Sequence, residues 1–196
     1  MSFPRAGGES CFRPGALHTQ PLTQPTIHVQ QEWAPLVISH FRSLGHPINI
    51  TASSLWGTWE THLRTLCLTV RCCPGAQELV RLMADCGTPL AVATSCFREG
   101  MEVKIEAQPS LFEHFKMTCV VTGDDPSVKR GKPNPDIFLE AARRIGVDPA
   151  ECLAFEDSLS GVRAAADAGC RVVAVPDGRD DVAEFWEAGA SRVIRR

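Results

Sequence analysis

The stretch GKPNPDIFLEAARRIGVDPAECLAFEDSLSGVRAAADAG, residues 131–169, decides the fold. In its middle lies a short apolar run, residues 152–155, flanked by two segments with helical spacing of their apolar residues. Each of these segments ends at a glycine, Gly146 or Gly169, and a glycine directly after the last periodic residue is a common helix stop. The stretch therefore predicts a helix, a short buried strand and a second helix, in that order.

Two adjacent carboxylates, Glu156 and Asp157, directly follow the apolar run. Like charges at the end of a buried strand repel each other and resist the loss of water, so a bound cation would explain them. The alternative is a solvated strand end, at which Asp157 or Ser160 caps the helix that follows. These residues on their own leave both interpretations open.

The same alternation extends over the chain from residue 74 to the C-terminal region. Strands are expected at residues 90–94, 119–121, 152–155 and 172–175, with helices between them and a last short strand near residue 193. Short continuous apolar runs that alternate with helices are typical of a parallel sheet covered on both faces. The predicted fold class is α/β, with a doubly wound parallel-sheet core.

Polar residues follow the expected strands at the edge where such sheets bind ligands. Thr94 and Ser95 follow the first strand, Lys132 lies in the loop after the second, and Glu156 and Asp157 follow the third. Hydroxyl groups and an ammonium suit a phosphate ester, and carboxylate oxygens suit Mg²⁺. Taken singly, the hydroxyls fit a helix cap and the lysine fits a solvated surface. The combination indicates a phosphate and Mg²⁺ site.

A second acidic pair, Asp124 and Asp125, follows the expected strand at residues 119–121. A solvated loop is the simpler interpretation of this pair, and a metal or substrate role is the alternative.

Composition limits the classes of function. The 196 residues are 44% apolar and 22% charged with a net charge of −3, which is typical of a soluble globular protein and argues against a nucleic-acid partner. No apolar stretch is long enough to span a membrane. The nine cysteines lack metal-binding spacing, which favours reduced thiols and a cytoplasmic location. The acid-poor N-terminal region, with Arg5 and Arg13, leaves an organelle transit peptide open.

The amino-acid composition also differs between the N-terminal part of the chain and the rest. No Asp precedes Asp85 and no Lys precedes Lys104. Residues 1–30 are rich in Pro, Gly, Gln and Thr and are expected to be a disordered or atypical segment. Residues 31–70 show helical spacing and are expected to form a partial helical cap, and residues 71–196 the core.

The motifs resemble those of a known family. The strings K-P-x-P-D-I-F and F-E-D-S-x-x-G-V-x-A-A-x-x-A-G resemble the third and fourth motifs of the haloacid dehalogenase superfamily of phosphohydrolases, and AVATS resembles the second. Residues 123–139 are most similar to the pseudouridine-5'-phosphatase group, followed by the β-phosphoglucomutase-like group. The resemblance implies an Mg²⁺-dependent phosphomonoester hydrolase that acts on a small phosphorylated metabolite, a sugar or nucleotide phosphate.

The resemblance also implies roles for the residues at the strand ends. By position, Thr94 would hold the transferring phosphoryl group, and Lys132 would neutralise its charge and orient the nucleophile. Glu156 and Asp157 would place Mg²⁺, directly or through water.

One part of the family pattern is missing from this sequence. The family begins with a strand ending in D-x-D-G, whose first Asp is the nucleophile and whose second is the general acid and base. Since no Asp precedes Asp85, neither role has a matching residue, and we expect little or no hydrolytic turnover. A non-catalytic phosphate-binding or regulatory protein, or a truncated fragment that does not fold alone, are the alternatives.

The missing strand also has a structural consequence. In the family it lies between the strands that would end at Thr94 and Glu156, so both neighbours lose a pairing partner. The segment TIHVQ, residues 26–30, alternates apolar and polar residues and is a candidate replacement strand.

Overall fold

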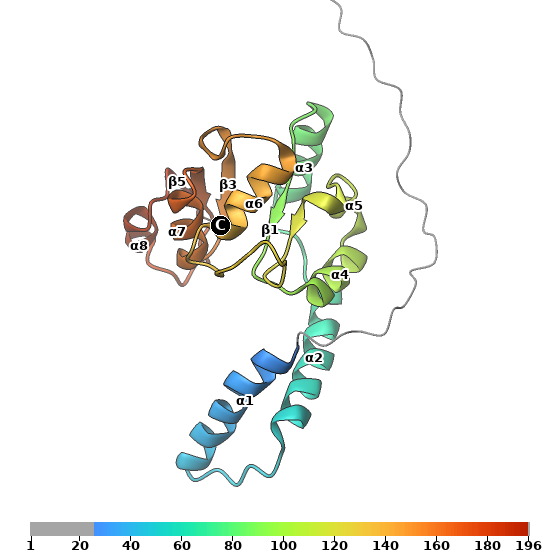
Figure 1. Cartoon of the computed structure of the whole chain (residues 1–196), viewed down its shortest axis with the longest axis vertical. Coiled ribbons are helices and arrows are strands. Elements are labelled where there is room, and N and C mark those ends of the chain that lie inside the picture. Colours follow the sequence, from blue (N-terminus) through green and yellow to red (C-terminus); the bar gives the residue numbers. More distant parts are fainter. Residues whose placement is uncertain (1–25, 196) are drawn as a thin grey trace, which may run out of the picture. The chain divides into compact units, whose positions relative to one another are not determined.

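The computed structural model describes the backbone of residues 26–195 and the side chains from residue 34 onward. The α-helices are α1 Thr26–Ser43, α2 Ala52–Thr69, α3 Ala76–Asp85, α4 Arg98–Ala107, α5 Pro109–Phe112, α6 Asp136–Ile145, α7 Leu159–Asp167 and α8 Val182–Glu187 (Figure 1). Two 3₁₀ turns are η1 Met117–Cys119 and η2 Pro149–Glu151. The strands are β1 Val92–Ala93, β2 Val120–Val121, β3 Leu153–Glu156, β4 Arg171–Ala174 and β5 Arg192–Val193.

The chain separates into two compact units, Met1–Trp56 and Gly57–Arg196. The division falls inside α2, which together with α1 confirms that the region from residue 31 to 70 is mainly helical. The candidate replacement strand at residues 26–30 is wrong, because these residues form the first turns of α1. A helix propagates more easily than it nucleates, and the helical spacing that follows residue 30 extends back through them. The segment before residue 26 lies outside the described residues.

All strand pairs in the described part are parallel, but they form two separate sheets. One contains β1 and β2, and the other has the order β3–β4–β5. Figure 1 shows β1 and β3 as arrows belonging to separate groups. The α/β parallel-sheet class is therefore confirmed. The strand expected at residues 90–94 is shorter than predicted, because only Val92 and Ala93 pair with β2.

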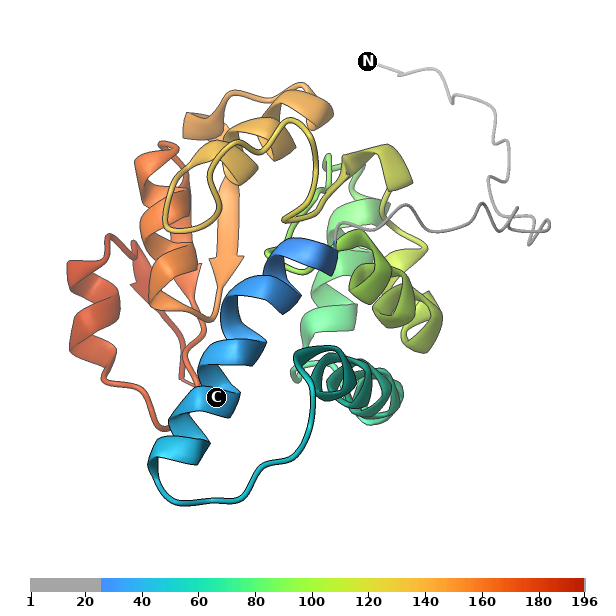
Figure 2. The same ribbon diagram turned by 60° about the horizontal axis from the view of Figure 1, so that its bottom comes forward.

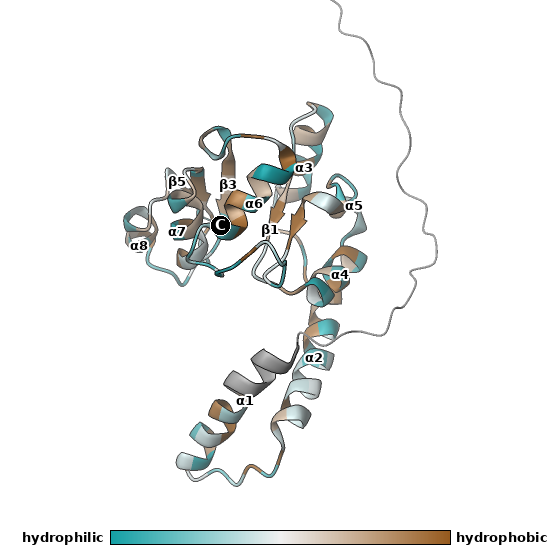
Figure 3. Cartoon of the chain, in the orientation of Figure 1, coloured by the Kyte–Doolittle hydropathy of each residue, from teal (hydrophilic) through white to brown (hydrophobic). Residues whose placement is uncertain are grey.

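The β3–β4–β5 sheet packs against a helix rich in small residues. Ala164 and Ala165 of α7 and Val172 of β4 are fully buried, and small side chains let the helix approach the sheet closely. Figure 2 shows α7 lying alongside this sheet, and Figure 3 shows hydrophobic colouring on the strands. Because a buried parallel sheet needs an apolar cover, this packing fixes where the carboxyl end of β3 lies.

The two predicted helix stops are confirmed. Gly146 directly follows α6 with a φ of 71°, and Gly169 lies two residues beyond α7 with a φ of 92°. L-residues with a Cβ rarely adopt this left-handed region, so glycine ends both helices at low cost.

Candidate functional site

Lys132 joins the carboxyl ends of the two sheets. Its Nζ donates a hydrogen bond of 3.1 Å to the backbone oxygen of Ala93, at the end of β1, and forms an ion pair with Oε1 of Glu156, at the end of β3. The side chains of Lys132 and Glu156 are only 9% and 8% exposed. The Lys132 ammonium also lies 4.9 Å from the centre of the Phe138 ring, a favourable arrangement for a cation. Lys132 is thus a buried, paired cation and not a surface lysine.

The Glu156 carboxylate packs against the first turn of α7. Ser158 Oγ donates to Glu156 Oε2 at 3.4 Å and accepts from the Gly161 backbone N–H at 3.1 Å, so Ser158 caps the helix. A methyl group at Gly161 would overlap the Glu156 carboxylate, so only glycine permits this approach. A negative charge is stabilised at a helix N-terminus. The local sequence therefore explains the position of Glu156.

Asp157 differs from its neighbour. It is exposed, and within residues 26–195 no hydrogen bond or ion pair joins it to another side chain. Ser158 occupies the capping position that the alternative interpretation gave to Asp157 or Ser160. Of the two adjacent carboxylates, Glu156 is thus engaged by protein groups and Asp157 is open to solvent.

The loop after β1 brings Thr94 and Ser95 to the same region. The Thr94 backbone N–H donates to Val121 O at 3.0 Å, which continues the β1–β2 pairing, and Thr94 Oγ1 accepts from the Cys96 N–H at 3.1 Å. The Thr94 hydroxyl thus stabilises a turn and is not the N-cap of α4, which begins at Arg98. Ser95 is exposed. Lys132 donates to the backbone oxygen of Ala93, and Thr94 directly follows Ala93 in the chain. Thr94 therefore adjoins the residue that the buried ammonium contacts.

Asp124 and Asp125, in the loop after β2, make polar contacts with α4 and α6. Asp124 Oδ1 accepts from the backbone N–H of Arg98 at 3.0 Å, in the first turn of α4. Asp125 is 6% exposed and forms an ion pair of 2.6 Å with Arg144. Burial by itself would raise the pKa of Asp125, but hydrogen bonds from Ser127 N–H and Arg144 outweigh it and lower that pKa. The solvated-loop interpretation is therefore wrong for the buried Asp125, whereas Asp124 is half-buried and accepts one backbone hydrogen bond.

Sequence reasoning missed Arg144, the centre of this network. Arg144 also pairs with Glu140 at 2.6 Å, and Glu140 accepts two further hydrogen bonds from Arg143. The bonds from Arg143, together with those from Arg144, lower the pKa of Glu140 to about 2. The spacing of Glu140 and Arg144 on one helix face was a signal for that pair. The link to Asp125 crosses 19 positions of the chain and has no sequence signal.

The residues present fit Mg²⁺ only when it is shared with a phosphate. Within the described part of the chain, no group of three or more His, Cys, Asp or Glu side chains is placed to hold a metal ion. Mg²⁺ is often bound by one or two carboxylates, with water and phosphate oxygens completing its coordination. Asp157 is the carboxylate free to act in this way, and Glu156 lies beside it, paired with Lys132.

The chain belongs to the haloacid dehalogenase-like hydrolases, whose family pattern it matches over residues 37–169. It is 44% identical over 125 residues to (DL)-glycerol-3-phosphatase 1, mitochondrial, of Arabidopsis thaliana, covering 62% of this chain and 41% of that protein. It is 40% identical over 131 residues to the probable pseudouridine-5'-phosphatase of Drosophila melanogaster, covering 62% and 56%. The crystal structure of a putative beta-phosphoglucomutase from Thermotoga maritima aligns with a TM-score of 0.67 and 27% identity, covering 80% and 77%.

These comparisons confirm the family resemblance drawn from the motifs. The chain nevertheless spans only about half the length of the curated relatives it matches. No helix in the described part is long and apolar enough to cross a bilayer.

Proposed function

We propose that this chain binds the phosphoryl group of a small phosphate monoester, together with Mg²⁺, beside Thr94, Lys132, Glu156 and Asp157. The site is that of an Mg²⁺-dependent phosphomonoester hydrolase from which the nucleophilic Asp is absent, so little or no turnover is expected. The observation that carries the proposal is the buried Lys132 ammonium, because it lies at the carboxyl ends of two strands beside a hydroxyl loop.

The proposed roles follow from the chemistry of each side chain. Lys132 is a fixed positive charge for an anionic phosphoryl group, and Glu156 orients it. Thr94 and Ser95 provide hydroxyl donors for phosphate oxygens. Asp157 is the open carboxylate for Mg²⁺, which when bound offsets phosphate charge.

The leading substrate is pseudouridine 5'-phosphate, based on the similarity of residues 123–139 to that group. Relatives named for pseudouridine 5'-phosphate and for glycerol 3-phosphate are nearly equal in identity, so both compounds belong in the test. A cytoplasmic location stays a prediction, and one relative carries "mitochondrial" in its name.

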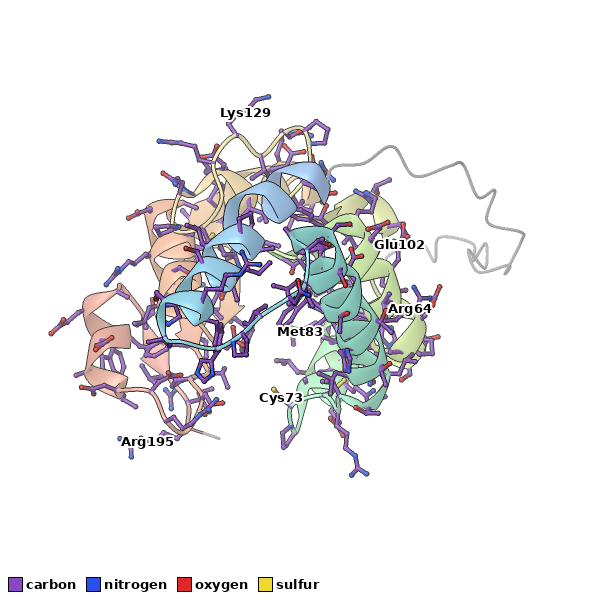
Figure 4. The ribbon with its side chains drawn as sticks, turned by 90° about the horizontal axis from the view of Figure 1, so that it is seen from below. Arg64, Cys73, Met83, Glu102, Lys129 and Arg195 are labelled. Atoms are coloured by element: carbon purple, nitrogen blue, oxygen red, sulfur yellow. The ribbon has the colours of Figure 1, made fainter. Side chains whose placement is uncertain are left out.

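Calorimetry with inorganic phosphate and Mg²⁺ tests the site directly. We expect saturable binding that Lys132→Met weakens by at least about tenfold, since a charge-assisted contact to phosphate is worth well over 1 kcal/mol. Lys129→Met is the matched control, because Lys129 is exposed and projects from the same loop (Figure 4). Unchanged phosphate binding in Lys132→Met would contradict the proposed site.

A phosphate-release assay on both substrates, with and without Mg²⁺, tests the expected lack of turnover. Rapid release that Asp157→Ala abolishes would show that the chain hydrolyses without the missing Asp and would overturn that expectation. Tight phosphate binding with no release is the result we expect, and it agrees equally with the alternative role, a non-catalytic phosphate-binding or regulatory protein.

A further inference from the structure

Two cysteines lie opposite each other where β3 and β4 begin. The register of the two strands pairs Leu153 with Arg171. Cys152 and Cys170 each directly precede one of these residues, and the Arg171 N–H donates to the Cys152 carbonyl at 3.1 Å. Neighbouring strands are about 4.8 Å apart, and the Cα atoms of a disulfide are roughly 4.4–6.8 Å apart. The backbone separation at this place is therefore one that a disulfide can span.

The two cysteine side chains lie on the same face of the sheet. Side chains alternate along a strand, so Cys152 shares a face with Ala154, and Cys170 shares a face with Val172. Ala154 and Val172 are partners in the register, and both are buried. Cys170 packs against the core cluster that contains them, and its N–H donates to the carbonyl of Ala165 in α7. Both thiols therefore lie on the face that α7 covers.

The ionisation of Cys170 depends on Cys152. Burial raises the pKa of Cys170 to about 11, and the negative charge of an ionised Cys152 contributes to this rise. Burial also raises the pKa of Cys152, and the carboxylates of Asp148 and Glu151 add to that effect. Since Cys152 ionises first and the thiolate is the nucleophile of thiol chemistry, Cys152 is the thiol that attacks and Cys170 the one that resolves.

We propose that Cys152 and Cys170 form a reversible disulfide, with a low-molecular-weight disulfide such as oxidised glutathione as the oxidant. The Cys152 thiolate attacks one sulfur of the oxidant, which breaks its S–S bond, forms a mixed disulfide and releases one thiolate. The Cys170 thiolate then attacks the Cys152 sulfur and releases the second thiolate. The two cysteine protons end on the two released thiols, so one oxidant molecule is reduced and two cysteines are oxidised.

The disulfide joins the amino ends of β3 and β4, away from the proposed phosphate site. Cys152 directly precedes β3, whereas Glu156 is its last residue. The closed loop contains β3 and α7, and a crosslink of this kind stabilises the folded chain chiefly by restricting the unfolded one. Oxidation is therefore expected to stabilise the β3–β4 pair. The proposal does not depend on hydrolysis or on phosphate binding.

Peptide mapping of the folded full chain, equilibrated with reduced and oxidised glutathione at about pH 8.5, tests the proposal. Trypsin, which cleaves after arginine, places Cys152 in peptide 145–163 and Cys170 in peptide 164–171, each with a single cysteine. We expect mass spectrometry to find these two peptides joined, with two hydrogens fewer than their sum. A folded chain that gives no joined peptide would overturn the proposal.

The same equilibrium measured in urea shows whether the fold brings the two thiols together. We expect the equilibrium constant for disulfide formation, relative to glutathione, to be at least about tenfold larger in the folded chain than in the unfolded one. Equal constants would overturn the proposal, because any two cysteines at this distance along the chain would then serve as well.

Two variants make the result specific to this pair. Cys170→Ser removes only the resolving thiol, so we expect Cys152 to stop at the mixed disulfide with glutathione and no joined peptide to form. Cys86→Ser is the matched control, because it removes an exposed thiol elsewhere and is expected to retain the joined peptide. Joined peptides found only in a covalent dimer on non-reducing electrophoresis would also overturn the proposal, since the bond would then link two chains.

Discussion

The β3–β4–β5 sheet and the β1–β2 pair share one apolar core cluster but differ in the ionic links that supplement it. The β3–β4–β5 sheet packs through apolar contacts, with Val162 and Val172 fully buried. The β1–β2 pair has strands of two residues, and its Val121 is buried in the same core cluster; it also has polar links, through Lys132 to β3 and through Arg144 to the loop after β2. Thr122, at the end of β2, has a buried hydroxyl without a hydrogen-bond partner in the described residues, a cost of about 1–3 kcal/mol. The two-residue strands of the β1–β2 pair form few backbone hydrogen bonds, so charged links supplement the apolar packing that both sheets share.

The largest expected effect tests the apolar packing of the β3–β4–β5 sheet. Phe185 of α8 is 1% exposed and belongs to the core cluster, whereas the next residue, Trp186, is 51% exposed. We expect Phe185→Ala to lower the free energy of unfolding by about 4 kcal/mol, because it removes buried apolar area and leaves a cavity. Urea denaturation followed by circular dichroism measures this change.

Trp186→Ala is the control for this substitution. It removes a larger aromatic side chain from the same helix, yet it is expected to cost less than about 1 kcal/mol. Similar losses for the two variants would show that the sheet is not stabilised by its buried cluster.

The second prediction concerns the ion pair between Arg144 and Asp125, which lies in the loop after β2. Arg144→Met leaves Asp125 buried without a charged partner, so we expect a loss of about 3 kcal/mol in the free energy of unfolding. Arg143→Met is the matched control, since Arg143 shares Glu140 but is 69% exposed, against 18% for Arg144. A surface ion pair of this kind contributes about 1 kcal/mol or less.

Chemical denaturation of both arginine variants gives the two values side by side. If Arg144→Met is as stable as Arg143→Met, the ion pair with Asp125 adds nothing to the apolar packing of the β1–β2 pair, and the contrast between the two sheets disappears.

Most of the fold followed from the sequence because the helices and strands carry strong local patterns. The spacing of apolar residues and the stops at Gly146 and Gly169 located α6 and α7. The short length of β1 and the helical state of residues 26–30 could not be predicted in this way, because each depends on which segments are available to pair. A two-residue strand carries no periodicity of its own.

The candidate site was only partly predictable. Motif positions selected Lys132 and Glu156, which the structure joins, but nothing in the sequence showed that Glu156 pairs with the lysine while Asp157 stays open. Asp125 was interpreted as part of a solvated loop because its partner, Arg144, lies on a distant helix. Long-range ion pairs are decided by tertiary packing, which local sequence patterns do not contain.

The smallest expected effect is a difference between the two sheets in how their stability responds to pH. The pKa of Glu140 is lowered from 4.5 to about 2 in the folded chain, so its contribution to stability is complete above about pH 5 and is lost as the pH falls toward 2. At pH 4, we expect a loss of about 1 kcal/mol in the opening free energy of the Val121 amide in β2, measured by hydrogen exchange against pH 7. The Val172 amide in β4 is expected to change less, because apolar packing around it does not titrate. Glu140→Gln removes one of the two titrating carboxylates of the network, so the difference between the two amides should shrink in that variant, and what remains belongs to Asp125, whose pKa is also lowered. Equal losses at Val121 and Val172 in the unmodified chain would mean that both sheets open together and that the ionic network does not act locally.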